Sequence, residues 1–206
     1  MTNPIPSSLR PRPLLLALLC ALSATAAEPK VDPASADEIL AAIVAKSKTT
    51  PNDYRVTLRL ANRYAVLARV ANSEQAYKKA LELNPSSMEP YYGLCLLYFA
   101  NKRYADAYRT ATSWITKDPH SYYGRLCLAD AMSLNRETKK SLPILIELNR
   151  NYPSDTTILN GLKTRYTFLG MTKEADTATK LIEEIEKSAV TDGLPAATNT
   201  STDPSR

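Results

Sequence analysis

Four prolines, Pro51, Pro85, Pro119 and Pro153, lie 34 residues apart from one to the next. Proline is tolerated in the first turn of a helix but not in its interior, and it disfavours helix in the residue before it. Each of these prolines therefore predicts a boundary between helical segments. A fixed period of this kind indicates a repeat architecture, in which every repeat packs on its neighbours.

Each segment between the prolines contains two stretches with apolar residues three and four apart, which is the spacing that lines one face of a helix. A polar break separates the two stretches, at Asn72-Ser73 in the first segment, Asn101-Lys102 in the second, Asn135 in the third and Gly170 in the fourth. Only 5 glycines occur in 206 residues, fewer than the turns of a β-rich fold need. We therefore expect an all-α fold in which every segment is a helix hairpin.

The residues at fixed positions of these segments resemble those of the tetratricopeptide repeat, a 34-residue helix-turn-helix. Its first helix carries an aromatic residue, Leu, a small residue and Tyr, and its second carries a small residue, an aromatic and Ala before a closing Pro. The matching residues are Leu60, Ala61, Tyr64, Ser73, Tyr77, Ala80 and Pro85 in the first repeat, Tyr91, Leu94, Cys95, Tyr98, Ala107 and Pro119 in the second, and Leu128, Ala129, Met132, Ser141 and Pro153 in the third. The resemblance covers about residues 54–187 and implies a right-handed superhelical solenoid of hairpin repeats.

The predicted repeat domain spans residues 51–189, with repeats at about 54–87, 88–121, 122–155 and a degenerate 156–189. In the second repeat Trp114 takes the slot of the small Ala and Ala111 takes the aromatic slot, an exchange that conserves volume and should keep the packing. The third repeat has Leu148 and Leu145 in these two slots. The fourth repeat has Lys163 in a small-residue slot and no closing proline, as expected of a terminal repeat with a polar outer face.

Residues 28–50 predict a linker and an N-terminal capping helix. Ser35 and Glu38 form a capping-box pattern ahead of an apolar stripe. The stripe consists of Ile39, Leu40, Ile43 and Val44. Because Pro51 shares the 34-residue period, this helix takes the place of the second helix of a preceding repeat. The tail, residues 190–206, is rich in Thr, Ser, Pro and Asp, and we expect it to be disordered.

Residues 1–27 have the pattern of a secretory signal peptide. Arg10 and Arg12 precede an apolar run from Leu14 to Leu22, and small residues follow before Glu28. The run is much shorter than the ~20 residues of a membrane span. We therefore expect cleavage, no stable membrane anchor afterwards, and a periplasmic or secreted protein. Lipidation of Cys20 is disfavoured because a large residue, Leu19, precedes it.

The charged residues argue against nucleic acid as a partner. The 26 basic and 21 acidic residues give a net charge of +5, and the basic ones are interspersed with acidic ones as on solvated helix faces. Cys95 and Cys127 remain in an oxidising compartment after export. The sequence leaves open whether they form a disulfide or stay as two buried thiols.

The candidate chemistry of the chain is sparse. His120 is the only histidine, in a turn with no obvious catalytic partner, and Glu183-Glu184 alternate with lysines on a polar face. No Cys or His pairs have the spacing of metal ligands, and no glycine-rich loop could hold a phosphate cofactor. The expectation is a protein that is not an enzyme and has neither metal nor cofactor.

The resemblance implies that the first helix of each repeat lines a concave groove for a protein or peptide partner. The groove residues would be Arg55, Leu58, Asn62, Tyr92, Leu96, Phe99, Tyr123, Leu126, Asp130, Asn160 and Thr164. Alternatively, Tyr92, Phe99 and Tyr123 pack between neighbouring helices. Some members of the family grip a chaperone's C-terminal carboxylate with Lys and Asn on the first helix, but Leu58 and Asn62 occupy those positions here. The later basic positions of that clamp hold Tyr123 and Cys127 instead.

Two functions agree with this pattern. The first is a non-enzymatic exported scaffold or adaptor that binds a protein or peptide in its groove. The second is a structural array of the cell envelope that self-associates as a homo-oligomer, without a separate ligand.

Overall fold

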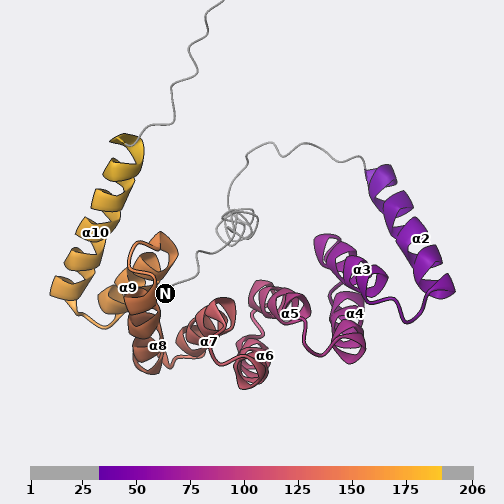
Figure 1. Cartoon of the computed structure of the whole chain (residues 1–206), viewed down its shortest axis with the longest axis horizontal. Helices are drawn as coiled ribbons and strands as arrows, with labels where there is room; N and C mark the ends of the chain where they lie inside the picture. The colour runs from indigo at the N-terminus through magenta and orange to yellow at the C-terminus, as the bar shows by residue number, and fades with distance from the viewer. Residues whose placement is uncertain (1–32, 192–206) are drawn as a thin grey trace, which may run out of the picture. The chain divides into compact units, whose positions relative to one another are not determined.

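The computed structural model describes residues 33–191; the predicted signal peptide and residues 192–206 of the predicted tail lie outside this range. The helices are α2 (Pro33–Thr49), α3 (Tyr54–Val66), α4 (Val70–Leu83), α5 (Glu89–Ala100), α6 (Tyr104–Lys117), α7 (Tyr122–Leu134), α8 (Thr138–Asn151), α9 (Thr156–Phe168) and α10 (Thr172–Thr191) (Figure 1). No strand occurs in the described range. The predicted all-α helical-repeat fold is confirmed.

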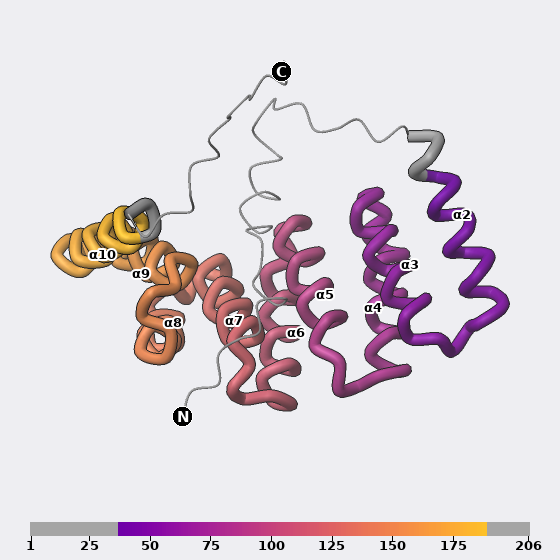
Figure 2. Tube along the Cα trace, turned by 45° about the horizontal axis from the view of Figure 1, so that its top comes forward, coloured from indigo at the N-terminus to yellow at the C-terminus, as the bar shows by residue number. Residues whose placement is uncertain are grey.

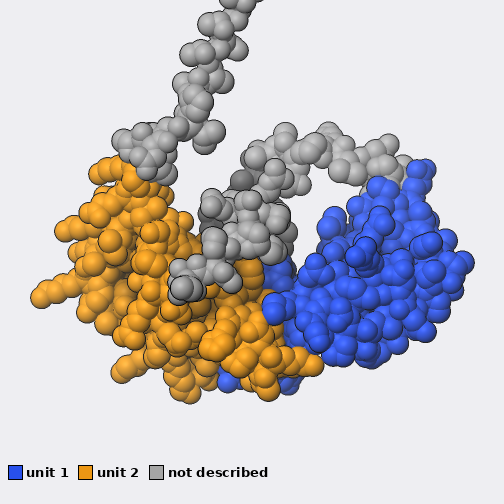
Figure 3. All heavy atoms as spheres, in the orientation of Figure 1, with its two compact units in different colours: residues 1–110 blue, residues 111–206 orange. Residues whose placement is uncertain are grey.

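The chain divides into two compact units, and the boundary falls inside α6 after Thr110 (Figure 3). In unit 1, α3 and α4 form a hairpin, α2 packs on α3, and α4 packs on α5 (Figure 2). In unit 2, α7 pairs with α8, α9 pairs with α10, and α8 packs on α9. Unit 1 thus contains the hairpin of α3 and α4, and unit 2 contains the hairpins of α7 with α8 and of α9 with α10.

The turn inside each hairpin is made in the same way. Ala68, Lys102, Arg136 and Gly170 lie 34 residues apart, and all four have a positive φ, between 53° and 72°. The residue after each one donates its N–H to the carbonyl five residues earlier, as Arg69 does to Tyr64 at 2.8 Å. This Schellman-type bond caps the end of the first helix. The turns therefore recur with the same 34-residue period as the prolines.

The break predicted at Asn72-Ser73 is wrong, because both residues lie inside α4. The chain turns at Ala68, four residues earlier. Ser73 is buried, and its hydroxyl donates to the carbonyl of Ala61 at 2.9 Å. Ser73 therefore resembles a turn residue in the sequence, but it is a small polar residue at the contact between α4 and α3. The other three predicted breaks coincide with turns.

Side chains at the starts of the helices also follow the period. Asp53 accepts from the N–H groups of Arg55 and Val56, and Asp155, three periods later, accepts from the N–H groups of Thr157 and Ile158. Ser121 caps α7 in a similar way. These caps satisfy N–H groups that have no partner within the helix.

The capping box predicted at Ser35 is wrong. Helix α2 begins at Pro33, so Ser35 lies inside the helix rather than before it. Proline suits a first helical turn because its fixed φ is helical and its missing N–H would have had no partner there.

The core of each unit consists of apolar and small side chains that the period places between helices. In unit 2 the cluster contains Leu126, Ala129, Leu142, Leu145, Leu148, Ile158 and Leu162. Trp114 and Ala111, which exchange large and small volumes, are both buried. Cys95 and Cys127 are present as buried thiols. Gly93 is required for close packing in unit 1, because a Cβ there would lie 2.3 Å from the ring of Tyr77.

Candidate protein-binding surface

In unit 1 the predicted groove residues lie on α3 and α5. Leu58, Tyr92, Leu96 and Phe99 are half-buried, whereas Arg55 and Asn62 are exposed. The Tyr77 hydroxyl donates to the Asn62 amide oxygen at 2.6 Å, and burial raises the pKa of Tyr77 to about 12. The exposed Asn62 side chain is therefore held in place by Tyr77, a buried residue of α4.

In unit 2 the predicted groove residues have more varied surroundings. Leu126 is only 8% exposed and belongs to the core cluster, so it offers little surface. Tyr123 is half-buried and packs edge-on against Tyr122, with ring centroids 4.9 Å apart. Asn160 and Thr164 are exposed, but each donates from its side chain to a carbonyl of its own helix.

A further set of first-helix residues was missed by the sequence reasoning. Val66, Leu134 and Phe168 are 75%, 48% and 76% exposed, and they occupy the same position of their repeats, with the exposed Ala100 in the second. Each lies four residues after a predicted groove residue, one helical turn further along the same face. These preceding groove residues are Asn62, Leu96, Asp130 and Thr164. Scattered exposed apolar side chains are ordinary, but here they recur with the repeat period.

Asp130 is held by a buried arginine that the sequence reasoning also missed. The guanidinium of Arg165 donates to Asp130 Oδ1 at 2.7 Å, to Ser141 Oγ at 2.8 Å and to the Gly161 carbonyl at 3.0 Å. The Arg165 residue is 4% exposed, whereas the Asp130 side chain is 29% exposed. A buried charge requires such partners, so this cluster ties α9 to both helices of the preceding hairpin.

The sequence contains a signal for this cluster. Arg165 lies 34 residues after Ala131, which is fully buried. The period therefore places an arginine at a core position, and a charge at such a position needs an acidic partner. Asp130, adjacent to Ala131, is that partner.

Unit 1 contains a second polar cluster, centred on Glu74 of α4. Its carboxylate accepts from Arg103 Nη1 at 2.6 Å, Lys78 Nζ at 2.7 Å and the Tyr98 hydroxyl at 2.9 Å. Burial opposes ionisation of Glu74, but these three hydrogen bonds outweigh it and lower the pKa to about 2. The Arg103 guanidinium also lies 4.6 Å from the ring centre of Tyr98. The cluster joins α4 to α5 and to the turn before α6.

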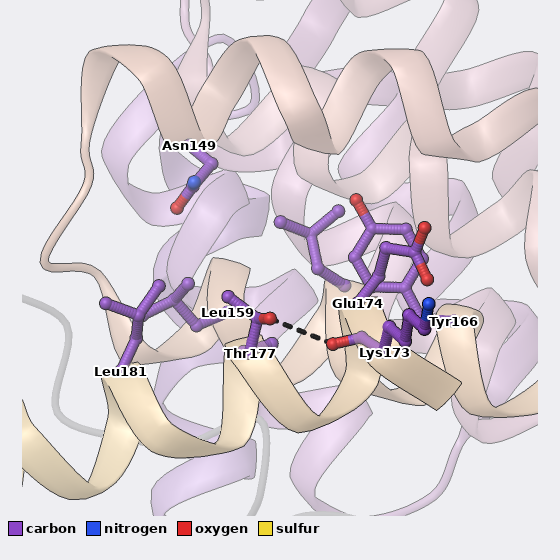
Figure 4. A pocket seen from close by; sticks show the side chains of 9 residues that line it. Asn149, Leu159, Tyr166, Lys173, Glu174, Thr177 and Leu181 are labelled. Atoms are coloured by element: carbon purple, nitrogen blue, oxygen red, sulfur yellow. Dashed lines mark hydrogen bonds between the residues drawn. The ribbon is translucent and has the colours of Figure 1, made fainter. Parts of the chain in front are cut away.

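A cleft of about 300 Å³ lies in unit 2 between α8, α9 and α10 (Figure 4). Leu159, Tyr166 and Leu181 form its apolar wall, and Lys173 and Glu174 lie at its polar edge. Burial, followed by the charge of Glu174, raises the pKa of Tyr166. The Thr177 hydroxyl donates a hydrogen bond to the Lys173 carbonyl at 2.8 Å. The cleft is open and carries no group of side chains arranged for acid–base or nucleophilic chemistry.

Other candidate chemistry within residues 33–191 is equally limited. No group of three or more His, Cys, Asp or Glu side chains in this range is placed to hold a metal ion. His120 is exposed, and its backbone N–H donates to Asp118 at 3.3 Å. Among the described helices, none combines the length and apolarity needed to cross a bilayer.

The structure is similar to solved structures of tetratricopeptide proteins. MamA is 19% identical with a TM-score of 0.68, over 77% of this chain and 93% of that chain. A tetratricopeptide repeat protein from Parabacteroides merdae ATCC 43184 is 20% identical with a TM-score of 0.62, over 80% of this chain and 61% of that chain. YrrB, described as a TPR protein with an unusual peptide-binding site, is 20% identical with a TM-score of 0.59, over 71% and 75%.

No family model and no curated protein sequence matches the chain. At these identities the structural matches establish the fold alone. The chain is thus a helical-repeat protein with a tetratricopeptide-type fold.

Proposed function

We propose that this protein is a non-enzymatic, exported scaffold or adaptor that binds a protein or peptide on the first helices of its repeats. The observation that carries the proposal is the recurrence of exposed apolar residues at one repeat position, Val66, Ala100, Leu134 and Phe168. They extend the predicted groove face by one turn on every first helix. The tetratricopeptide-type fold and the peptide-binding site named for YrrB support this proposal.

In unit 1 the binding face would combine Tyr92, Leu96 and Phe99 of α5 with Arg55, Leu58, Asn62 and Val66 of α3. In unit 2 it would combine Tyr123, Asp130 and Leu134 of α7 with Asn160, Thr164 and Phe168 of α9, while Leu126 supports the face from beneath. Aromatic anchors with polar neighbours are typical of peptide recognition. The apolar leader, residues 1–27, supports export, and the sparse chemistry of the described residues supports a role in binding.

The test is to capture partners with the chain from an envelope extract, identify them by crosslinking and mass spectrometry, and titrate a purified partner against variants. Tyr92→Ala with Tyr123→Ala, and Phe168→Ala, should each weaken binding at least about tenfold, as loss of an interface anchor does. Met88→Ala and Leu181→Ala, at residues exposed outside this face, are the matched controls and should leave affinity unchanged. Equal affinity of all variants would show that the face is wrongly assigned.

The alternative, a self-associating array, is separated by sedimentation of the purified chain over a range of concentrations. A concentration-dependent assembly that Phe168→Ala abolishes, with no other protein captured, would favour the array.

A further inference from the structure

Helix α2 is half of a repeat. By the 34-residue period it corresponds to the second helices α4, α6, α8 and α10. Those helices follow a left-handed turn, but Ala34, the counterpart of Ala68, lies inside α2. Within residues 33–191, α2 therefore has no first helix of its own, although it packs on α3 as α4 packs on α5.

The face of α2 that a first helix would cover is exposed. Ile39 is 46% exposed, whereas its counterparts Ser73 and Ser141 are fully buried. Lys46 is exposed, whereas its counterparts Ala80 and Leu148 are buried. In the hairpin of α3 and α4 the position of Ile39 contacts the first helix, because the Ser73 hydroxyl donates to the Ala61 carbonyl of α3. The exposure of Ile39 and Lys46 on α2 marks a helix position that no residue within 33–191 fills. We call this position, around Ile39, Ile43 and Lys46 of α2 and Val56 and Arg59 of α3, the vacant seat.

The vacant seat contains a cleft of about 190 Å³ between α2 and α3. Its lining residues are Ala42, Ile43 and Lys46 from α2 and Val56 and Arg59 from α3. Val56 corresponds to Ile158, which is fully buried in unit 2. The floor of the cleft is therefore apolar and of the kind that packed helices cover in later repeats.

The rim of the vacant seat is cationic. Arg59 corresponds to Gly93 and Gly161, which are small because side chains of the preceding helix lie against them. Lys46 stands at a position that is small or apolar elsewhere, and no ion pair of Lys46 or Arg59 occurs among the described residues. A bound helix would need acidic side chains to complement them.

We propose that the vacant seat binds an acidic amphipathic helix of another protein, which completes α2 as a full repeat. First helices in this chain have 12 or 13 residues, so the seat suits a helix of about that length. The chain's own sequence is a poor occupant, because the period would place that helix at residues 20–32 with Pro29 in its interior. The cleft of the vacant seat is lined on α3 by Val56 and Arg59, whereas the groove face uses other residues of that helix.

The probe is a synthetic peptide with the α3 sequence, Tyr54–Val66, carrying Arg55→Glu, Arg59→Glu and Arg63→Glu, and the unaltered peptide is the matched basic control. The full chain should bind the acidic peptide about tenfold more tightly than the basic one in fluorescence anisotropy, because the charges on seat and peptide are opposite. Lys46→Glu with Arg59→Glu should reverse this preference. Ile39→Ala should weaken binding of the acidic peptide, because it removes apolar contact without changing the charge, and Val66→Ala should not.

Equal affinity for the two peptides, or an unchanged preference in the charge-reversed protein, would overturn the proposal. Binding to phosphatidylglycerol vesicles that the charge reversal abolishes, without peptide binding, would assign the seat to a membrane instead. Self-association abolished by Ile39→Ala would assign it to a second copy and equally refute the partner helix. Because Phe168→Ala leaves the seat intact, its effect on captured partners tests the groove face separately.

Discussion

Replacement of Arg165 by Met should destabilise unit 2 by about 3 kcal/mol, near the lower end of the cost of breaking a buried ion pair. The change keeps an unbranched side chain but removes three hydrogen bonds, to Asp130, Ser141 and Gly161. Ser141 keeps a partner, because its hydroxyl also donates to the Thr138 carbonyl at 2.7 Å. Asp130 loses its counter-charge, but its 29% exposure lets water offset part of the loss.

The free energy of unfolding should be measured by urea titration, with hydrogen exchange of α9 amides as a local readout. Asp130→Asn in the Arg165→Met background should restore part of the loss, because an uncharged amide is cheaper to leave without the arginine. The double-mutant cycle should give a coupling of about 2 kcal/mol between the two side chains. A loss below about 1 kcal/mol for Arg165→Met, or additive effects, would refute the inference that this pair anchors the last repeat.

Two further predictions test the turns and the polar cluster of unit 1. Gly170→Ala should lower the free energy of unfolding in urea by about 1 kcal/mol, because φ at this residue is 72° and a side chain disfavours that conformation. No atom lies within 4 Å of the new Cβ, so a steric clash would not contribute to the loss. Ala68→Gly should be neutral or stabilising, and a loss of stability in both variants would contradict a strained left-handed turn. Glu74 has a folded pKa of about 2 against a usual 4.5, so its stabilisation is complete above about pH 4.5 and is lost as the pH falls towards 2. Glu74→Gln should therefore be about 1–2 kcal/mol less stable than the unaltered chain at pH 7, a modest value because Arg103 and Lys78 are partly solvated. The difference in stability should shrink as the pH falls towards 2. A difference that is the same at both pH values would show that the cluster does not form.

The helix hairpins could be predicted because prolines, apolar spacing and chain length all point to one period. The first turn could not be located from polar residues, because Asn72 and Ser73 are polar for different reasons: one is exposed on a helix, and the other is a buried small residue bonded to Ala61. The period would have placed the turn at Ala68, in line with Gly170. Local polarity was therefore a weaker guide than register, because a helix interface also uses small polar residues.

The candidate surface was less predictable than the fold. Family positions placed Leu126 in the groove, but this side chain packs into the core of unit 2. Conversely, no family position drew attention to Phe168, which is exposed at the end of α9. Exposure depends on the volumes of surrounding side chains and on how deeply each helix lies in the hairpin. A residue pattern along one helix contains neither quantity.

Comparison of counterparts across repeats explains why the exceptional residues stand where they do. A repeat fold presents a similar environment every 34 residues, so a charged residue that is covered at a position where its counterparts are apolar needs a partner that those counterparts lack. Arg165 differs from Ala131, and its different neighbour is Asp130 within the chain. Lys46 also stands where its counterpart Ala80 is buried, but Lys46 is exposed to water and makes no ion pair with the described residues. A helix bound in the vacant seat would cover Lys46 and remove this water, so that helix would have to supply the carboxylate that Asp130 supplies to Arg165.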